Sequence, residues 1–345
     1  MRSSRWAARH STPPDPGSAP AGGGGHDWAV GAAVDLVIPN LDGEALLSAC
    51  LEGVAAQTLA PARVIVIDSG SVDGSRAIVE AHGAEWHELP ANKGFAAAVN
   101  HGIAISDSPY VALLNNDAVP EPGWLEAMVD ALERDPGLSF AASRMLFTGD
   151  RGMNAAGDGF DVRGRGGYNR GIREPDGPRF DEPRIVFGAC AGAALYRRSL
   201  FHDIGLFDEQ LFLSWEDVDL DLRAALAGHR CLYVPTAVVH HAQGASSGDW
   251  RPALERRNKA ILALKGLPLP LLGLYLTLLP AREAYETRAA REGVRDYVRR
   301  LAPYASEARS SLRRRSEVRR RTGTRELWPL LTRESLPYEP PQRSR

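Results

Sequence analysis

Hydrophobic and polar positions alternate in blocks from residue 34 onward, and the blocks have two different periods. Segments 34–39 and 64–68 are short runs of aliphatic, β-branched residues, the pattern of strands buried on both faces. Segment 44–57 between them has helical periodicity, so the three together predict a βαβ unit. Further elements of the same kind are predicted as helices over 73–82 and 94–106, a strand over 110–115 and a helix starting near Glu121. This alternation predicts an α/β fold with a mostly parallel central sheet and helices on both faces.

The pattern changes at residue 149. Residues 149–184 are rich in Gly, Arg and Asp and have little periodicity, which predicts a long loop or lid. Regular elements resume near Val186, with a helix predicted over 216–227 and strands over 230–234 and 237–241. From Trp250 onward the pattern is helical and increasingly basic.

These changes divide the chain into three parts. Residues 1–27 are rich in Pro, Gly and Ser and are expected to form a disordered leader. Residues 28–265 carry the alternating pattern and are expected to form one α/β domain. Residues 266–345 comprise an apolar segment followed by a basic helical tail.

Charge is distributed unevenly along the chain. The formal net charge is −2, but residues 281–345 hold 17 Arg and no Lys against 9 acidic residues, a local charge of +8. The triplets 313–315 and 319–321 predict either contact with anionic lipid head groups or a solvated helix face. Segment 267–279 is apolar but shorter than the roughly 20 residues that cross a bilayer, so it is expected at a membrane interface or in the core.

Cysteine spacing and the first residues bear on the compartment. Cys50, Cys190 and Cys231 have none of the spacings of a zinc site or a disulfide framework, so we expect reduced thiols. Residues 1–27 contain no continuous apolar stretch of the kind found in secretory signals. We therefore expect a cytoplasmic protein, peripheral at most on the inner face of the plasma membrane.

Candidate ligand-binding residues follow the predicted strands, where open α/β sheets bind ligands. The first strand ends in Pro39 and Asn40, followed by Asp42, and the second ends in Asp68. An acid that closes a buried strand can accept hydrogen bonds from a nucleobase or ribose. Turn and helix-cap chemistry is the alternative, especially for Asp73.

Two further groups suit phosphate and metal. Asn92 and Gly94 precede a helix of small residues, whose N-terminus favours a diphosphate. Asn116 and Asp117 follow the strand over 110–115, where carboxylate and amide oxygens can hold a divalent cation that bridges two phosphates.

The last group combines acids, an aromatic residue and histidine. Glu216 and Asp217 begin a predicted helix beside Trp215, where a carboxylate can act as general base, although acids also favour helix N-termini for electrostatic reasons alone. His240 and His241 follow a predicted strand and are either metal ligands or structural residues.

Taken together, these segments are similar to a known family. The ordered series VIPNLDG, VIVIDSGSVDGS, NKGFAAAVNHGI, ALLNNDAVPEPGWL, GACAGAALYRR, GLFDEQLFLSWEDVDLDLR and HHAQGAS resembles inverting family-2 glycosyltransferases, most of all their rhamnosyltransferase-like branch. The resemblance spans residues 34–265 and implies a glycosyltransferase-A fold, in which a nucleotide-binding sheet merges with an acceptor-binding half.

The resemblance also implies roles for individual residues. It puts Asp42 and Asp68 at the nucleoside, Asp117 at a Mg²⁺ or Mn²⁺ ion and the diphosphate, and Asp217 as catalytic base. His241 is implied as second metal residue, in preference to His240, by its spacing to Gly244 and Ser246. The remaining candidates that we expect at the substrates are Pro39, Asn40, Asn92, Gly94, Asn116, Trp215 and Glu216. The sequence departs from the family at Asp42, usually Asn, and in having Asn-Asn-Asp where two acids are usual.

The implied reaction is transfer of a sugar, rhamnose included, from a nucleoside-diphosphate sugar to a glycan or lipid-linked acceptor in cell-envelope polysaccharide synthesis. Two other classes stay open at this stage. A nucleotidyltransferase would also use a strand-end acid and a metal, but the Gly-rich phosphate loop it normally has near the first strand is absent. A non-catalytic nucleotide-binding or scaffold protein would work through its basic tail, although few aromatic residues interleave there and a nucleic-acid partner is not expected.

Overall fold

The computed structural model describes residues 33–149, 152–163, 166–242 and 250–341. The predicted leader, residues 1–27, lies outside these residues, as do Gly244 and Ser246, whose spacing favoured His241. The disorder of the leader therefore stays a prediction.

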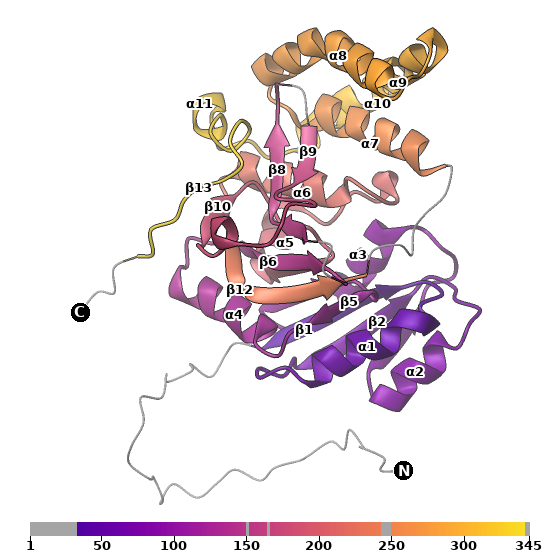
Figure 1. Ribbon diagram of the computed structural model, residues 1–345, viewed down its shortest axis with the longest axis vertical. Helices are drawn as coiled ribbons and strands as arrows, with labels where there is room; N and C mark the ends of the chain where they lie inside the picture. The colour runs from indigo at the N-terminus through magenta and orange to yellow at the C-terminus, as the bar shows by residue number, and fades with distance from the viewer. Residues whose placement is uncertain (1–32, 150–151, 164–165, 243–249, 342–345) are drawn as a thin grey trace, which may run out of the picture.

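The first half of the fold is the βαβ arrangement that the periodicity predicts (Figure 1). Strand β1 pairs in parallel with both β2 and β4, and β2 pairs in parallel with β3. The register places Asn40 opposite Asp68, so the polar residues that close β1 and β2 meet at one sheet edge. The elements of this half are β1 (Val34–Asn40), α1 (Glu44–Ala55), β2 (Arg63–Asp68), α2 (Ser75–His82), β3 (Glu85–Glu88), α3 (Phe95–Ile105), β4 (Tyr110–Leu114), β5 (Ala118–Pro120) and α4 (Trp124–Arg134).

The second half extends the same sheet with strands of both directions. In the described part of the chain the sheet has eleven strands, in the order β13-β10-β12-β6-β11-β4-β1-β2-β3, with β5 on β12 and β7 on β6. Three of these strands come from later segments: β7 (Met153–Ala156), β10 (Arg184–Val186) and β13 (Leu336–Pro337). Strand β11 inserts antiparallel between β4 and β6, while β12 runs parallel to β6. The α/β class is confirmed, but the sheet is more mixed than predicted, because buried strands have the same apolar pattern in either direction. The elements are β6 (Phe140–Phe147), β11 (Ala193–Arg197), α5 (Arg198–Ile204), η2 (Glu209–Leu211), α6 (Glu216–Ala227) and β12 (Cys231–His241).

Helices cover both faces of the sheet, as predicted. One hydrophobic cluster packs α1, α2 and α4 against side chains such as Leu36 and Ile38 of β1. The other packs α3, α5 and α6 against the opposite face, which includes Val37. Side chains that alternate along β1 therefore enter different cores, which explains why this strand is apolar throughout.

Two predictions about the middle of the chain need correction. The described residues of segment 149–184 are not an unstructured lid, because they form regular elements. These are β7 (Met153–Ala156), the hairpin of β8 (Asp158–Asp161) and β9 (Gly166–Asn169), η1 (Pro178–Phe180) and the start of β10 (Arg184–Val186). Glycine is needed in this hairpin, because a Cβ on Gly159 would lie 2.4 Å from the ring of Tyr168. A strand rich in glycine has no hydrophobic periodicity, so the sequence pattern did not indicate it. The two predicted strands over 230–241 form one strand, β12, with an irregular register between Val234 and Val238.

The C-terminal segment is helical, as predicted, and packs on the rest of the fold. Its elements are α7 (Arg251–Gly266), α8 (Leu269–Ala289), α9 (Val294–Ser306), α10 (Ala308–Arg313), η3 (Arg314–Glu317), α11 (Thr324–Leu327) and β13 (Leu336–Pro337). A third hydrophobic cluster joins these helices to α6 and to the β8–β9 hairpin, and it buries Leu271, Leu272, Tyr275 and Leu279. Of the two expectations for segment 267–279, these four side chains fit the buried core. Among the described helices, none combines the length and the apolar character needed to cross a membrane.

The arginine triplets bind the protein itself. Arg314 forms an ion pair with Asp208, and Arg321 forms one with Asp203. Arg315 donates hydrogen bonds of 2.7 and 2.6 Å to the carbonyl oxygens of Leu264 and Leu267. The triplets are therefore not a simple solvated face, and contact of their exposed arginines with lipid head groups stays a prediction.

Candidate active site

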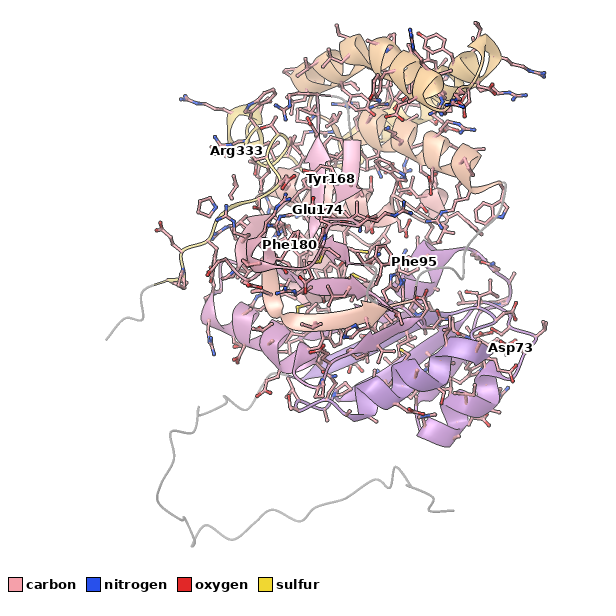
Figure 2. All side chains as sticks on the ribbon, viewed as in Figure 1. Asp73, Phe95, Tyr168, Glu174, Phe180 and Arg333 are labelled. Atoms are coloured by element: carbon pink, nitrogen blue, oxygen red, sulfur yellow. The ribbon has the colours of Figure 1, made fainter. Side chains whose placement is uncertain are left out.

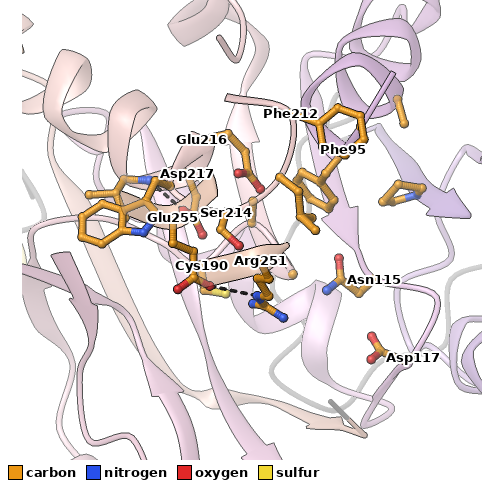
Figure 3. Close-up of a pocket in the computed structure, with 18 of the residues that line it drawn as sticks. Phe95, Asn115, Asp117, Cys190, Phe212, Ser214, Glu216, Asp217, Arg251 and Glu255 are labelled. Atoms are coloured by element: carbon orange, nitrogen blue, oxygen red, sulfur yellow. Dashed lines mark hydrogen bonds and ion pairs between the residues drawn. The ribbon is translucent and has the colours of Figure 1, made fainter. Parts of the chain in front are cut away.

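An open cavity of about 540 Å³ lies at the carboxyl ends of β1 and β4 (Figure 3). Its other walls are the start of α3, the β8–β9 hairpin, residues 212–217, the end of β12 and the start of α7. All the candidate residues except Asp42 and Asp68 line it: Pro39, Asn40, Asn92, Gly94, Asn116, Asp117, Trp215, Glu216, Asp217 and His241. Segments as far apart in the sequence as Pro39 and Glu255 thus converge on one site.

Asp42 and Asp68 hold the loops behind this cavity. The buried Asp68 carboxylate accepts hydrogen bonds from the amides of Gly70 and Ser71 and from Asn40 Nδ2. Asp42 Oδ1 accepts a 2.9 Å bond from the amide of Val72. Their contact with a nucleoside stays a prediction, but it is Asn40, positioned by Asp68, that reaches the cavity.

Asn92 and Gly94 shape the start of α3. Asn92 Oδ1 accepts a 2.9 Å bond from the amide of Gly94, which has a φ of +88°. A Cβ at Gly94 would lie only 2.2 Å from the carbonyl oxygen of Phe212, so glycine is required for this contact. The predicted diphosphate contact at this helix end is untested. Asp73, in contrast, accepts bonds from the amides of Glu44 and Ser75, as expected for a turn and cap, and Figure 2 shows it far from Tyr168.

Asp117 and His241 lie side by side because β5 and β12 are paired strands, and both are buried. His241 Nε2 lies 2.9 Å from Asp117 Oδ1, while His241 Nδ1 lies 3.3 Å from Asn154 Oδ1. At 2.9 Å the contact with Asp117 is a hydrogen bond in which Nε2–H donates to the Asp117 carboxylate, and a bound divalent cation would take the place of that proton. Adjacent carboxylate and imidazole lone pairs suit a divalent cation that takes mixed O and N ligands, with the second ring nitrogen fixed by a hydrogen bond.

Two observations limit and support this donor set. No group of three or more His, Cys, Asp or Glu side chains within the described ranges could hold a metal ion, so any further ligands would be amide or backbone oxygens, substrate or water. His240 points the other way along β12 and pairs with Glu121 at 2.9 Å. His241 therefore lines the cavity and His240 does not, and the preference for His241 as the metal residue stays a prediction.

The opposite wall carries a group of carboxyl groups, of which Glu216 and Asp158 are buried and Asp217 is half-buried. Glu216 is 5% exposed, and its Oε2 atom has no hydrogen-bond partner among the described residues. Burial, and then the charge of Asp217, raise the pKa of Glu216 from 4.5 to about 8. Burial also raises the pKa of Asp217, whose Oδ1 accepts a 2.8 Å bond from the amide of Val218. An ionised carboxylate with a raised pKa is a stronger base, and a protonated neighbour lowers the repulsion around it.

Asp158 belongs to the same wall, although sequence reasoning did not select it. It lies at the start of β8, in the segment predicted as a lid, and its Oδ1 accepts a 3.3 Å bond from Asn169 Nδ2. Burial, followed by the charges of Asp217 and Glu216, raises the pKa of Asp158 well above its ordinary value. No local pattern marks this residue, because its importance depends on contacts that form between distant segments.

Aromatic and basic residues complete the cavity, and most of them were also missed. Trp215, in the left-handed region with φ +76°, turns its ring toward Gly167, where any Cβ would lie 3.2 Å from a ring carbon. Tyr168 comes from the β8–β9 hairpin, and the pair formed by Arg251 and Glu255 at 2.8 Å comes from α7. Because the hairpin was predicted as irregular and α7 as an ordinary helix, neither was assigned to the site.

Comparison with known proteins indicates a glycosyltransferase. The family model described as "Glycosyl transferase family 2" matches residues 35–205. The chain is 34% identical over 245 residues to a pre-mycofactocin glycosyltransferase of Mycobacterium tuberculosis, a match that covers 67% of this chain and 48% of the relative. It is 29% identical over 227 residues to an N-acetylglucosaminyl-diphospho-decaprenol L-rhamnosyltransferase of the same species, covering 57% of this chain and 72% of that relative. The matched region thus spans about half the length of the first relative.

The fold is also shared with a solved structure. The structure described as GalNAc-T7 with UDP, GalNAc and Mn²⁺ superposes with a TM-score of 0.55 at 16% identity, covering 69% of this chain and 48% of that one. At this identity the similarity shows the glycosyltransferase-A type of fold alone.

Proposed function

Because the chain belongs to glycosyl transferase family 2, we propose that it transfers a sugar from a nucleoside-diphosphate sugar to an acceptor hydroxyl, with inversion at the anomeric carbon. The observation that carries this proposal is the convergence of two kinds of group in one cavity. Asp117 and His241 offer metal ligands at one wall, and Asp217 offers a half-buried carboxylate at another. A single displacement needs a leaving-group side and a base side of this kind.

On the donor side, Asn40 and Asn116 line the part of the cavity where the nucleotide would bind, and Asp117 and His241 would hold Mg²⁺ or Mn²⁺. The bound cation would offset the negative charge that develops on the leaving diphosphate. The histidine favours Mn²⁺, since Mg²⁺ prefers oxygen ligands alone. The solved structure of the same fold that is described with UDP and Mn²⁺ is in keeping with this assignment.

On the acceptor side, Asp217 removes the proton from the acceptor hydroxyl as that oxygen attacks the anomeric carbon from the face opposite the diphosphate. Glu216 holds its proton at neutral pH, because its pKa is about 8. Glu216 is then uncharged, so only Asp217 of these two neighbours is negative when it accepts the proton of the acceptor hydroxyl. The indole of Trp215 and the ring of Tyr168 offer apolar surfaces for a sugar ring. The transition state resembles an oxocarbenium ion, by analogy with glycoside hydrolysis.

The finer assignment concerns the sugar and the pathway. We propose rhamnose as donor sugar and a glycan or lipid-linked acceptor of cell-envelope polysaccharide synthesis. The support comes from the relative named as a rhamnosyltransferase acting on a diphospho-decaprenol acceptor and from a second, 25% identical relative named as an O-antigen biosynthesis protein of Myxococcus xanthus.

The proposed location is the inner face of the plasma membrane, with peripheral attachment through α8 and α9. Leu269 and Tyr285 on α8 and Val294 and Val298 on α9 are between 57% and 80% exposed, and Arg295 lies beside the two valines. Apolar side chains next to a basic one suit an anionic lipid surface. Sedimentation with phosphatidylglycerol vesicles should weaken in the double variant Val294→Asp, Val298→Asp and in high salt. Equal sedimentation of variant and wild type would remove this part of the proposal.

The deciding experiment incubates the full chain and Mn²⁺ with a panel of nucleoside-diphosphate sugars and acceptors, glycans and pre-mycofactocin included. Release of nucleoside diphosphate that depends on both a particular sugar nucleotide and an acceptor is the expected result. Release of pyrophosphate from nucleoside triphosphates would instead indicate a nucleotidyltransferase. Tight nucleotide binding without turnover on any pair would indicate a binding protein.

A further inference from the structure

The segment 208–217, which we call the 208–217 loop, has an unusual backbone. Phe212, Ser214 and Trp215 adopt φ angles of +58°, +67° and +76°, the left-handed region that side chains other than glycine rarely occupy. The loop lines the cavity from Phe212 onward, and its last two residues, Glu216 and Asp217, begin α6. Strained conformations of this kind persist only where surrounding contacts fix them, so the contacts of this loop determine where the carboxyl groups stand.

One contact comes from α7, in the middle of the helix. The Asn258 side chain is fully buried, and its Nδ2 atom lies 2.6 Å from the carbonyl oxygen of Leu211, 3.0 Å from that of Leu213 and 2.8 Å from that of Ser214. Its Oδ1 atom has no hydrogen-bond partner in the described structure. A buried amide with an unpaired acceptor is unfavourable in itself, which indicates that its NH₂ group is what this position requires.

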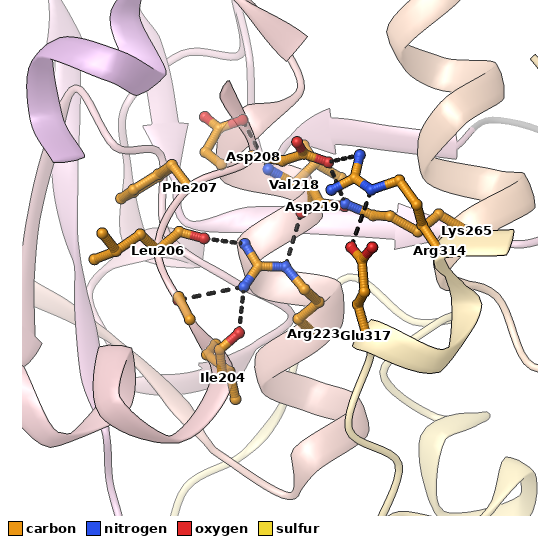
Figure 4. A network of polar contacts seen from close by, with 12 residues as sticks. Ile204, Leu206, Phe207, Asp208, Val218, Asp219, Arg223, Lys265, Arg314 and Glu317 are labelled. Carbon is orange, nitrogen blue, oxygen red and sulfur yellow. Dashed lines mark hydrogen bonds and ion pairs between the residues drawn. The ribbon is translucent and has the colours of Figure 1, made fainter. Parts of the chain in front are cut away.

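A buried ion-pair network fixes the two ends of the loop (Figure 4). Lys265 Nζ lies 2.6 Å from Asp208 Oδ2, at the first residue of the loop, and 2.6 Å from Asp219 Oδ1, on α6 just after it. Asp219 is also paired with Arg223 at 2.8 Å. These side chains are at most 9% exposed, so the pairs are little screened by solvent.

The tail adds a further anchor to the same network. Arg314 Nη1, from η3, lies 2.9 Å from Asp208 Oδ2 and 2.7 Å from Gln210 Oε1. Burial by itself raises the pKa of Asp208, but the charges of Lys265 and Arg314 outweigh it and lower that pKa to about 2. Asp208 is therefore ionised at neutral pH, and a residue of the basic tail takes part in holding the loop that forms the cavity wall.

We propose that Asn258, Lys265 and Arg314 are positioning residues for sugar transfer, through which α7 and the C-terminal tail hold the 208–217 loop and so place Asp217 and Trp215 at the acceptor. This inference rests on the proposed function. A base must lie within hydrogen-bond reach of the proton it removes, and a displacement of about 1 Å can lower the rate by about 10²-fold. The donor-side residues Asn40, Asp117 and His241 come from other elements. The contacts of Asn258, Lys265 and Arg314 with the 208–217 loop are therefore expected to act on the acceptor side.

The test compares two variants of the full chain with a matched control. Asn258→Leu removes the three contacts to loop carbonyls while keeping the side-chain volume close, and Arg314→Leu removes the tail anchor at a partly exposed position. Arg321→Leu is the control, because Arg321 also joins the tail to the body through an ion pair, but with Asp203 on α5. The measurements are kcat for transfer, donor KM, binding stoichiometry and affinity for nucleoside diphosphate with Mn²⁺, and amide hydrogen exchange.

We expect kcat to fall about 10- to 100-fold in Asn258→Leu, and less in Arg314→Leu, with donor KM and nucleotide affinity within about two-fold of wild type. Hydrogen exchange should accelerate over residues 208–217 and little elsewhere. Arg321→Leu should match wild type in all of these measurements.

Unchanged kcat and unchanged exchange in both variants would overturn the inference, as would a loss of activity that only follows a loss of nucleotide-binding stoichiometry, because that is general misfolding. If Asn258→Leu is insoluble, Arg314→Leu decides by the same criteria. A wild-type chain that transfers no sugar would refute the proposed function instead, and the exchange measurement would still test whether these side chains hold the loop.

Discussion

Replacement of Glu216 by Gln should stabilise the protein, by an amount that grows with pH. The pKa of Glu216 is about 8 in the folded chain against 4.5 as its ordinary value, a difference of about 3.5 that corresponds to roughly 5 kcal/mol at 1.36 kcal/mol for each pKa unit. This is an upper limit, because Glu216 shares its titration with Asp217 and the unpaired Oε2 atom can gain water. We expect about 2–3 kcal/mol at pH 8.

The sign follows from which state binds the proton. Below pH 4.5 Glu216 is protonated whether the chain is folded or not, and the substitution should have little effect. Between pH 4.5 and 8 the unfolded chain loses this proton while the folded chain keeps it, so wild-type stability falls relative to the variant. Above pH 8 the difference should reach its full value.

Thermal unfolding of the full-length Glu216→Gln variant and wild type, measured from pH 5 to pH 8.5, checks this expectation. Glu255→Gln is the matched control: Glu255 lines the same cavity, but its neighbour is Arg251 rather than another carboxylate, so its removal should not stabilise the fold. A difference in midpoint temperature between Glu216→Gln and wild type that stays constant over this range, or is largest at pH 5, would refute the reasoning.

Three more predictions concern the reaction and the tail. Asp217→Asn should lower transfer by about 10²–10⁴-fold and leave nucleoside-diphosphate affinity within a few-fold, measured by product release and calorimetry; near-normal turnover would remove Asp217 as base. Asp117→Ala should abolish stimulation by Mn²⁺ and His241→Ala should weaken it, and wild-type activity that is unaffected by a chelator would contradict both assignments. Deletion of residues 281–345 should give insoluble or inactive protein, since it removes tail contacts to the core; a soluble truncated chain with full activity on a small acceptor would show that these contacts are dispensable.

Several features of the site could be predicted because they depend on short stretches of chain. The apolar runs that end in Asn40 and Asp68 indicate neighbouring parallel strands, and such strands bring their terminal residues to one sheet edge. The helix predicted over 216–227 has those bounds in the structure, with Glu216 and Asp217 at its start. The candidates on these segments, apart from Asp68, therefore line the cavity, although their chemical roles depend on ligands and stay predictions.

The sequence by itself determined the alternation of strands and helices, the sheet edge at which the cavity lies and most of the residues on it, because periodicity reports which side chains must be buried. The tertiary structure alone decided which partner each face meets. It inserted β11 antiparallel between β4 and β6 and placed the β8–β9 hairpin in the wall of the cavity. It also brought Asp158 near Asp217 and Glu216, where burial and the charges of these two neighbours raise the pKa of Asp158. It also turned Arg314 inward to Asp208, since an arginine in a basic run has the same local pattern whether its partner is water, lipid or a carboxylate distant in the sequence.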